Sequence, residues 1–216
     1  MALRIDTELK QPCPDLRIAW VSGAVTVEKS SDALVALLNH QAAESAKVGE
    51  PAAQPEIAAT RDAYKRLGKE PSRYRGSAEA LLRRVVSGKG LNFINNLVDV
   101  NNLVSLESLL PLGAYDLSKV APEIVFRIGK PGETYKGIGK DLINIADLPV
   151  FADQDGPFGS PTSDSERAMI TTATTRFGMA IISFSGRSDL KQWAGRAIEL
   201  LSIHAAGREL DFQEVV

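Results

Sequence analysis

Residues 153–167 read Asp-Gln-Asp-Gly-Pro-Phe-Gly-Ser-Pro-Thr-Ser-Asp-Ser-Glu-Arg, and two apolar runs enclose them, Leu148 to Ala152 and Phe177 to Phe184. The stretch holds two Gly, two Pro, four hydroxyl residues and five charges, which predicts a loop between two buried strands. Because Pro fixes the backbone and Gly lets it approach a ligand closely, the loop is suited to a preformed cradle of N–H groups. The alternative, favoured by composition alone, is a surface turn held by Asx and Ser/Thr hydrogen bonds.

The composition is that of an ordinary globular protein, with 216 residues, 44% of them apolar and 24% charged, and we expect one domain spanning residues 1–216. The single Cys13 has no Cys or His nearby, which argues against a disulfide, a metal site or a catalytic thiol and fits a reducing cytoplasm. Met1 to Lys10 lacks the apolar region of a signal peptide, and no window approaches the roughly eighteen apolar residues of a membrane span. We therefore expect a cytoplasmic protein without a membrane span, whose oligomeric state the sequence leaves open.

Positive charge is concentrated in one segment, although the whole chain carries a net charge of −2. Between Arg61 and Lys89 there are nine basic and three acidic residues, so this segment carries +6 and the remainder −8. Such asymmetry is a common footprint of phosphate contact. A pair of amphipathic helices with solvated basic faces is the alternative interpretation.

Hydrophobic periodicity predicts five helices and at least four strands. The expected helices run from Ser30 or Ser31 to before Gly49, over Ala52 to Leu67, from a Ser77 cap through Val86, over Leu91 to Leu110, and from Ser188 and Asp189 through His204. The expected strands cover Leu16 to Val27, Ile124 to Ile128, Val150 to Ala152 and Phe177 to Phe184, with a turn into a further strand over Pro111 to Asp116. This order predicts an α+β fold with the helices gathered on one side of a sheet.

The segment from Leu91 to Leu110 is unusually rich in short polar residues for a helix, with Asn95, Asp99, Asn101 and Asn102 beside its apolar stripe. Solvated helix surfaces prefer Lys, Glu and Gln, so these amides are expected to fix backbone or a ligand through directional hydrogen bonds. We place a structural network slightly ahead of ligand contact, because a buried Asn most often satisfies neighbouring backbone.

Several chemistries lack the residues that they need. The only histidines, His40 and His204, lie in helical segments, which gives little support to a Ser-His-Asp triad around the hydroxyls of the loop. Asp153 and Asp155 do not have calcium-loop spacing, and the sequence has no Walker loop, kinase motif set or dinucleotide fingerprint. We expect no metal, no cofactor and no ATP-dependent ligase activity.

Two motifs resemble the editing module in the β subunit of bacterial phenylalanyl-tRNA synthetases. They are Asn95-Asn96-Leu97-Val98-Asp99-Val100-Asn101-Asn102, similar to N-V-V-D-x-T-N, and Pro111-Leu112-Gly113-Ala114-Tyr115-Asp116, similar to P-L-H-A-F-D. The Arg61 to Arg84 segment and the G-P-F-G-S-P-T-S-D-S-E-R run within residues 153–167 resemble free-standing relatives of that module more closely. The resemblance covers about residues 60–185 and implies two sheets with a helical layer.

The resemblance also implies a function, since the module in the synthetase hydrolyses tyrosine wrongly esterified to the phenylalanine tRNA. A pocket that hydrogen-bonds a phenol hydroxyl can reject the analogue lacking it, and ester cleavage needs a positioned water and donors for the oxyanion. Two departures matter: the family's His is Gly113 here, and the acidic residue after the paired glycines of the family's loop is replaced near Ser160.

Two functional hypotheses follow. The first is a free-standing hydrolase that clears mischarged aminoacyl-tRNA, and the second is a module that binds tRNA, an amino acid or another small ligand in the same cleft without turnover. For the hydrolase, water is expected to be oriented by one of Asp155, Ser163, Asp164 or Glu166. The expected substrate-binding residues are Asn101, Asn102, Gly113, Tyr115, Gly156, Gly159, Ser160 and Thr162, and the expected RNA-binding residues are Arg73, Arg75, Arg83 and Arg84.

Overall fold

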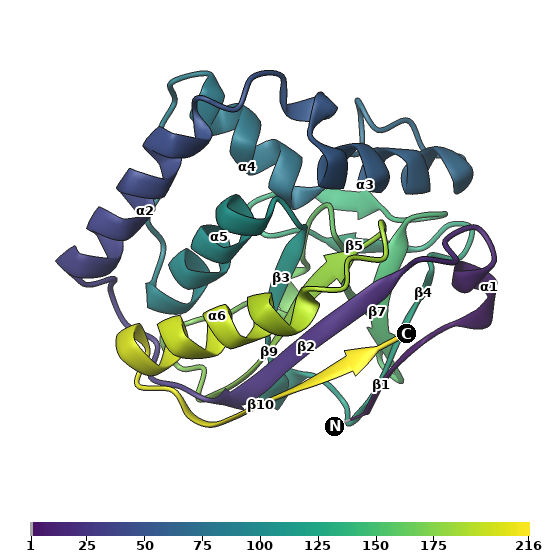
Figure 1. Cartoon of the computed structure of the whole chain (residues 1–216). Coiled ribbons are helices and arrows are strands. Elements are labelled where there is room, and N and C mark those ends of the chain that lie inside the picture. The colour runs from purple at the N-terminus through teal and green to yellow at the C-terminus, as the bar shows by residue number, and fades with distance from the viewer. Residues whose placement is uncertain (1) are drawn as a thin grey trace.

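The computed structural model describes residues 2–216, which form three layers (Figure 1). The middle layer is a sheet with the strand order β10 (Arg208–Val215), β2 (Arg17–Ala24), β9 (Arg176–Ser183) and β3 (Leu112–Asp116). The second sheet has the order β1 (Ala2–Ile5), β4 (Glu123–Ile128), β7 (Pro149–Asp153) and β8 (Gly156–Gly159), and a separate hairpin joins β5 (Thr134–Lys136) to β6 (Leu142–Asn144).

Helices form the third layer, on the face of the middle sheet opposite the second sheet. They are α2 (Asp32–Ser45), α4 (Ser77–Val86), α5 (Asn96–Ser108) and α6 (Leu190–His204). The remaining helical elements are α1 (Thr7–Lys10), α3 (Pro55–Arg66) and three short turns, η1 (Pro51–Ala53), η2 (Leu117–Lys119) and η3 (Glu166–Ala168). The predicted α+β fold of two sheets with a helical layer is confirmed.

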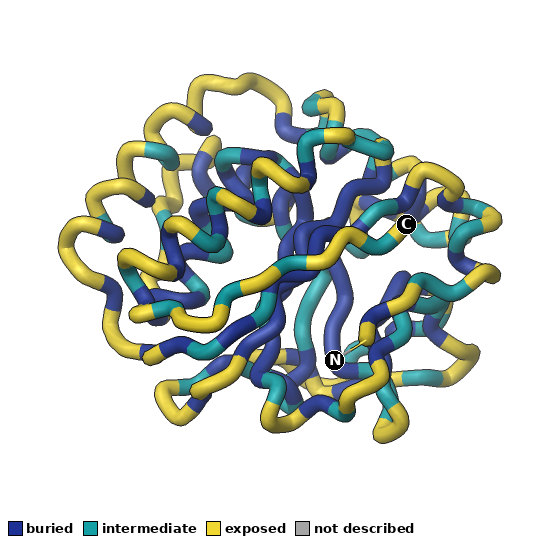
Figure 2. The backbone as a smooth tube through the Cα atoms, turned by 60° about the horizontal axis from the view of Figure 1, so that its bottom comes forward, coloured by how far each residue is buried: buried dark blue, intermediate teal, exposed yellow. Residues whose placement is uncertain are grey.

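The middle sheet is buried on both faces, and Figure 2 shows its central strands as the most continuously buried part of the chain. Successive side chains of a strand point to opposite faces. In β2, Ala19 and Val21 therefore join the cluster under the helices, whereas Ile18 and Trp20 join the cluster between the sheets. This double burial explains why the sequence of β2 is a near-continuous apolar run.

One glycine of β9 makes room for the largest side chain of the inner core. A Cβ on Gly178 would lie 2.1 Å from Cζ2 of Trp20, so only glycine fits at this position. The Trp20 ring also stacks on Tyr115 of β3, with 6.1 Å between ring centroids. The site described below is built on this packed aromatic core.

Four predicted elements differ in detail from the observed ones. Ser77 is the first residue of α4, after a Gly76 cap, and its hydroxyl donates instead to the Leu112 carbonyl. The expected helix from Ala52 is interrupted, because Pro55 starts α3 after the short turn η1. The helix expected from Leu91 begins only at Asn96, where Asn95 caps it by accepting the Val98 N–H at 2.9 Å. The expected loop at 153–167 contains the strand β8, which pairs with β7.

Two strands that the sequence pattern missed complete the sheets. The chain begins with β1, which pairs in parallel with β4, and ends with β10, which pairs antiparallel with β2. Both lie at sheet edges, and β10 alternates charged residues with only partly buried apolar ones. Helix α3 also departs from the expected one-sided arrangement, because Tyr64 packs into the cluster between the sheets. Within residues 2–216, no helix has the length and apolar character needed to cross a membrane.

Candidate functional site

A pocket of about 200 Å³ lies where α5, the β5–β6 hairpin and the polar stretch after β8 meet. Its walls are mainly apolar, and only two of its lining residues are polar, Asn101 and Asp164. The apolar lining consists of Ile94, Val98, Ala114, Ile138, Met169 and Ile170. An apolar cavity with a few converging polar groups is the usual form of a small-molecule site.

A larger hollow, of about 700 Å³, lies elsewhere, against β1 and β4. Its most buried polar group, the Asp153 carboxylate, is already paired with Arg167 at 2.9 Å and accepts the Ala121 N–H at 2.9 Å. This hollow therefore offers no unpaired buried group to a ligand, and the smaller pocket is the better candidate.

Residues 160–165, which we call the site loop, are held by their own hydrogen bonds. The Ser160 hydroxyl accepts the N–H groups of Thr162 and Ser163 at 3.3 and 3.1 Å and donates to the Ser163 carbonyl at 2.9 Å. The Ser165 N–H returns to the Phe158 carbonyl at 3.1 Å. The loop is thus a compact Ser-centred turn that projects Asp164 into the pocket.

The expected cradle of free N–H groups is wrong, because the hydroxyl of Ser160 already fills it. The N–H of Ser160 itself donates to Asp164 Oδ1 at 3.3 Å. Gly156 adopts a left-handed backbone, with φ of 111°, but its carbonyl accepts from Arg167 at 2.9 Å. An oxyanion would have to find its donors outside the site loop.

Asp164 is the polar centre of the pocket. Its Oδ1 accepts the Tyr115 hydroxyl at 2.9 Å in addition to the Ser160 N–H. Burial raises the pKa of the Asp164 carboxyl to about 7, and the two hydrogen bonds offset only part of this effect. Burial likewise raises the pKa of Tyr115, with the Asp164 charge adding to the effect. The carboxyl therefore exchanges its proton near neutral pH while Tyr115 stays a donor.

Gly113 and Gly159, both predicted to contact substrate, instead make room for Tyr115. A Cβ on Gly113 would lie 2.3 Å from the Tyr115 hydroxyl oxygen, and one on Gly159 would lie 2.3 Å from its ring. The family's His at position 113 is therefore incompatible with this packing, because its Cβ would occupy the space of the Tyr115 hydroxyl. Tyr115 itself is fully buried, so it can act on a ligand only through Asp164.

The two predicted asparagines have different environments. The Oδ1 atom of Asn101 is buried and has no hydrogen-bond partner among residues 2–216, although Asn101 lines the pocket. Asn102 is half-buried and is not one of the lining residues. A buried acceptor without a hydrogen-bond partner lowers the stability of the fold. A ligand that donates a hydrogen bond to Asn101 Oδ1 would restore the missing interaction.

The other polar residues of α5 form the predicted structural network. Asn96 accepts the Glu28 N–H at 3.1 Å and donates to the carbonyls of Thr26 and His204, both at 2.9 Å. Asp99 accepts the Ser30 hydroxyl at 2.6 Å. These bonds anchor α5 to the chain before α2 and to the last residue of α6, and so fix the position of Asn101.

The remaining predicted catalytic residues do not converge with Asp164. Asp155 is exposed at the turn between β7 and β8, and Glu166 pairs with Lys136 at 3.0 Å. The Ser163 hydroxyl accepts from Lys140 at 3.3 Å. Thr162, predicted to bind substrate, shares a hydrogen bond of 2.7 Å with the buried Tyr64 hydroxyl. Only Asp164 of the four predicted water-orienting residues lines the pocket.

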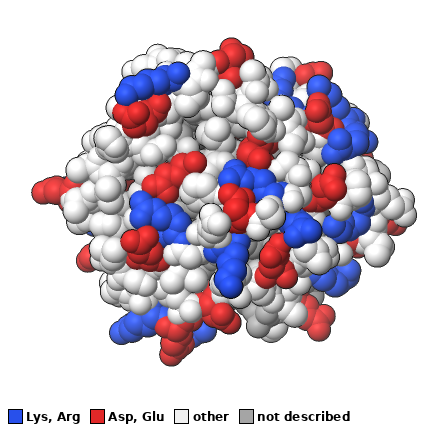
Figure 3. All heavy atoms as spheres, in the orientation of Figure 1, with Lys and Arg blue, Asp and Glu red and all other residues white. Residues whose placement is uncertain are grey.

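The predicted RNA-binding arginines fall into two pairs. Arg83 is tied to Glu79 at 2.8 Å and to Glu50 at 2.9 Å, and Arg84 donates to the Gly90 carbonyl and to Asn92. Arg73 and Arg75 are exposed, and within residues 2–216 neither forms a salt bridge. Figure 3 shows basic and acidic side chains interspersed on the face it presents. Part of the +6 charge thus forms contacts within the fold, whereas Arg73 and Arg75 are exposed to solvent.

The pocket walls Ile94, Ile138 and Met169 were not predicted as site residues. Ile94 and Ile138 are exposed, at 62% and 41%, and lie in irregular segments. The helix expected from Leu91 would have included Ile94, but it begins only at Asn96. The one available signal was an isolated Ile between Gly137 and Gly139, a pattern typical of an apolar tip on a tight turn. No group of His, Cys, Asp and Glu suited to a metal ion occurs in the part of the chain that the structure describes.

Comparison with known proteins gives concordant results. Residues 59–204 match the family model of the B3/4 domain. The phenylalanine–tRNA ligase β subunit of Anaeromyxobacter dehalogenans is 39% identical over 109 residues, which cover 47% of this chain and 13% of that protein. The same subunit of Carboxydothermus hydrogenoformans is 37% identical over 86 residues, covering 38% of this chain and 10% of that protein. The chain thus matches about a tenth of the length of these curated relatives.

A solved structure shares the fold. An N-terminal fragment of the phenylalanyl-tRNA synthetase β subunit from Pyrococcus horikoshii superposes with a TM-score of 0.54 and 13% sequence identity, covering all of this chain and 51% of that one. Together with the sequence matches, this confirms the resemblance to a module of the synthetase β subunit.

Proposed function

Because this chain belongs to the B3/4 domain family, we propose that it hydrolyses the ester bond between an amino acid and the 3′ end of a tRNA. The observation that carries this proposal is Asp164, a carboxyl with a pKa of about 7 that lines an apolar pocket. A general base works best when its pKa lies near the working pH. The names of the relatives, all β subunits of a tRNA ligase, supply the class of substrate.

The pocket suits the side chain of one amino acid. Its volume of about 200 Å³ is below the range of roughly 300–1,000 Å³ that holds larger ligands. The walls favour an apolar or aromatic side chain, and the unpartnered Oδ1 of Asn101 favours a ligand that donates a hydrogen bond. A phenol hydroxyl or the α-ammonium group of the amino acid meets that requirement.

In the proposed reaction, the Asp164 carboxylate accepts a proton from a water molecule while the water oxygen attacks the ester carbonyl. Collapse of the tetrahedral intermediate breaks the bond to the ribose oxygen, which takes the proton from Asp164. The products are a free amino acid and a tRNA with a free 3′-terminal hydroxyl. Tyr115 holds the carboxyl in place through the 2.9 Å bond to Oδ1, which leaves Oδ2 for water.

A binding module without turnover is the second candidate. Two observations favour it: the N–H groups of the site loop are already satisfied by Ser160, and Gly113 stands where the family has a His. Both remove groups that would stabilise an oxyanion or move a proton. The two candidates share the pocket, but the binding module takes tRNA, an amino acid or another small ligand without turnover.

Deacylation of a panel of misacylated tRNAs separates the two candidates. A hydrolase releases at least one amino acid faster than the uncatalysed reaction, and Asp164→Asn slows that release. A binding module releases none of them yet still binds the tRNA or the amino acid. If Asp164→Asn keeps both the deacylation activity and the binding of wild type, this pocket is not the site in either proposal.

A further inference from the structure

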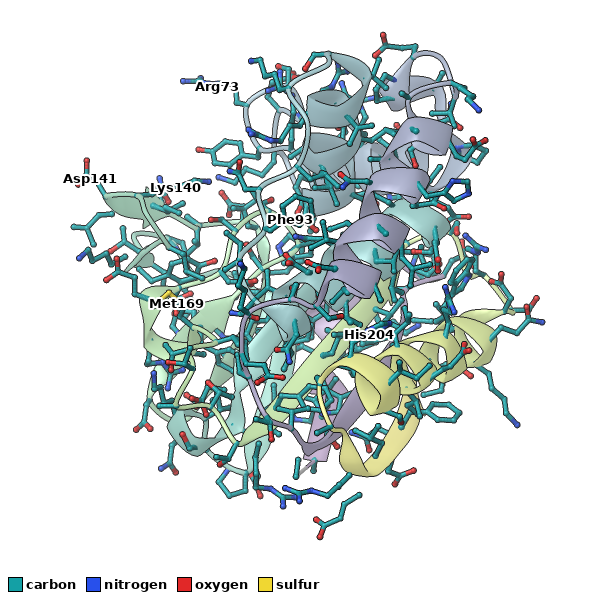
Figure 4. The ribbon with its side chains drawn as sticks, turned by 90° about the vertical axis from the view of Figure 1, so that its left-hand side faces the viewer. Arg73, Phe93, Lys140, Asp141, Met169 and His204 are labelled. Carbon is teal, nitrogen blue, oxygen red and sulfur yellow. The ribbon has the colours of Figure 1, made fainter. Side chains whose placement is uncertain are left out.

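An exposed aromatic side chain stands at the rim of the pocket. Phe93 is 42% exposed and directly precedes Ile94, which lines the pocket. Figure 4 shows Lys140 and Met169 at the left of the view, with Phe93 to their right. Two further exposed apolar residues, Ile94 and Ile138, line the pocket at 62% and 41% exposure, and exposed apolar groups gathered at one place mark a binding surface.

The segment that carries Phe93 has no regular secondary structure but is clamped on both sides. On one side Arg84 donates to the Gly90 carbonyl at 2.7 Å and to Asn92 Oδ1 at 2.9 Å. On the other side Asp99 Oδ1 accepts the Ile94 N–H at 3.1 Å. The ring is thus presented by a fixed backbone, and little ordering entropy remains to be lost on binding.

Two cations lie close to the site loop. Lys140, at the tip of the β5–β6 hairpin, reaches the Ser163 hydroxyl of the site loop at 3.3 Å. Arg75 is exposed and lies two residues before Ser77, whose N–H donates to the Pro161 carbonyl of the site loop at 2.6 Å. Within residues 2–216 neither cation forms a salt bridge, so both charges remain available to a ligand near the site loop.

We propose that Phe93 is the stacking platform for the terminal unpaired base of an RNA 3′ end, with Lys140 and Arg75 contacting the adjacent phosphates. This inference rests on the proposed function, since it names how the RNA half of the substrate is held while the amino acid occupies the pocket. Aromatic rings beside basic groups are the usual means of binding single-stranded nucleic acid, because every base has a face to stack. The cations near the site loop favour an anionic strand over an apolar protein surface.

The test is equilibrium binding of two fluorescently labelled RNA hairpins by the full chain. One hairpin has an unpaired 3′ end that finishes in adenosine, and the other lacks only that last nucleotide. Wild type is expected to bind the longer RNA about 10-fold more tightly, the effect of one stacked base. Phe93→Ala and Phe93→Leu should both abolish this difference, and Phe93→Trp should keep it. Leu142→Ala, which truncates another exposed apolar residue of the same region, should change nothing.

Three outcomes would overturn the platform: equal binding of both RNAs by wild type, binding of neither, or full discrimination by Phe93→Ala. Because the assay measures binding alone, it separates this inference from the proposed hydrolysis. Discrimination that depends on Phe93 supports the platform even if wild type deacylates nothing. If wild type deacylates tRNA and Phe93→Ala has no effect on RNA binding, the stacking platform is excluded and the proposed hydrolysis remains supported.

Discussion

Replacing Asp164 by Asn should make the protein more stable at alkaline pH. Asn keeps the shape of the side chain, and its carbonyl oxygen can still accept the Tyr115 hydroxyl and the Ser160 N–H. What the substitution removes is the charge that wild type must bury above pH 7. Burial raises the pKa of this carboxyl from 3.8 to about 7, which corresponds to at most about 4 kcal/mol of unfolding free energy.

The sign follows from proton binding. Between pH 4 and pH 7 the folded wild type holds a proton on Asp164 that the unfolded chain has lost, so its stability falls as the pH rises through this window. The Asp164→Asn variant has no carboxyl at this position, so its stability does not fall for this reason. Relative to its value at pH 4, the stability difference between Asp164→Asn and wild type should therefore grow to about 2–4 kcal/mol at pH 8.

Urea unfolding at pH 4 to 8, followed by the fluorescence of the two Trp residues, measures this difference. Burial lowers the pKa of His204, so His204 makes the stability rise with pH, opposite to Asp164. Because His204 is present in both proteins, comparing the variant with wild type isolates the contribution of Asp164. Asp15→Asn, at an exposed carboxyl, is the matched control and should show no growth. A stability difference for Asp164→Asn that stays constant with pH would refute the assigned burial of its charge.

Four further predictions concern the surroundings of the pocket and the domain. Tyr115→Phe deletes a hydrogen bond that lowers the pKa of Asp164, so the pH profile of deacylation should move to higher pH, and an unmoved profile would contradict this role. Replacing Arg73 and Arg75 by Ala should reduce the salt dependence of tRNA binding by roughly 0.7–0.9 in log–log slope per lost phosphate contact; unchanged affinity at low salt would exclude them. Gly113→Ala should destabilise the fold by about 1–3 kcal/mol and by less when combined with Tyr115→Phe, whereas additive effects would show that the hydroxyl is not the obstacle. Calorimetry should show one cooperative transition for a single domain, and two transitions would argue for two.

The apolar pattern of the long elements predicted an α+β fold with helices on one side of a sheet, and the family resemblance implied the second sheet. Doubly buried β2 and β9 and the stripe of α6 are unambiguous from composition and period. The edge strands β1 and β10 were not predicted, because they are short or mostly solvated and their conformation depends on pairing with strands distant in sequence. When a strand forms because of the strand it pairs with, its own sequence shows no clear strand pattern.

For the site, the sequence located the loop and placed Asp164 among four candidates, but it could not choose between them. The choice depends on Tyr115, which reaches Asp164 only because Gly113 and Gly159 leave room for its ring and hydroxyl. The local sequence pattern suggested ligand contact for both glycines, because it does not show that the Tyr115 side chain packs back over Gly113 of its own strand β3 and across to Gly159 of β8. The prediction of free backbone N–H groups was wrong for a similar reason. The sequence does not show that the Ser160 hydroxyl accepts these N–H groups in place of a ligand.

The most direct test of the central claim is the rate at which wild type and Asp164→Asn deacylate the same misacylated tRNA. The proposed mechanism predicts that wild type hydrolyses at least one member of the panel and that Asp164→Asn lowers its rate by roughly 10²-fold or more. The affinity for the tRNA should stay nearly the same, because the carboxylate acts in the transition state. Hydrolysis by Asp164→Asn at the wild-type rate, or no hydrolysis by wild type of any tRNA in the panel, would contradict the claim.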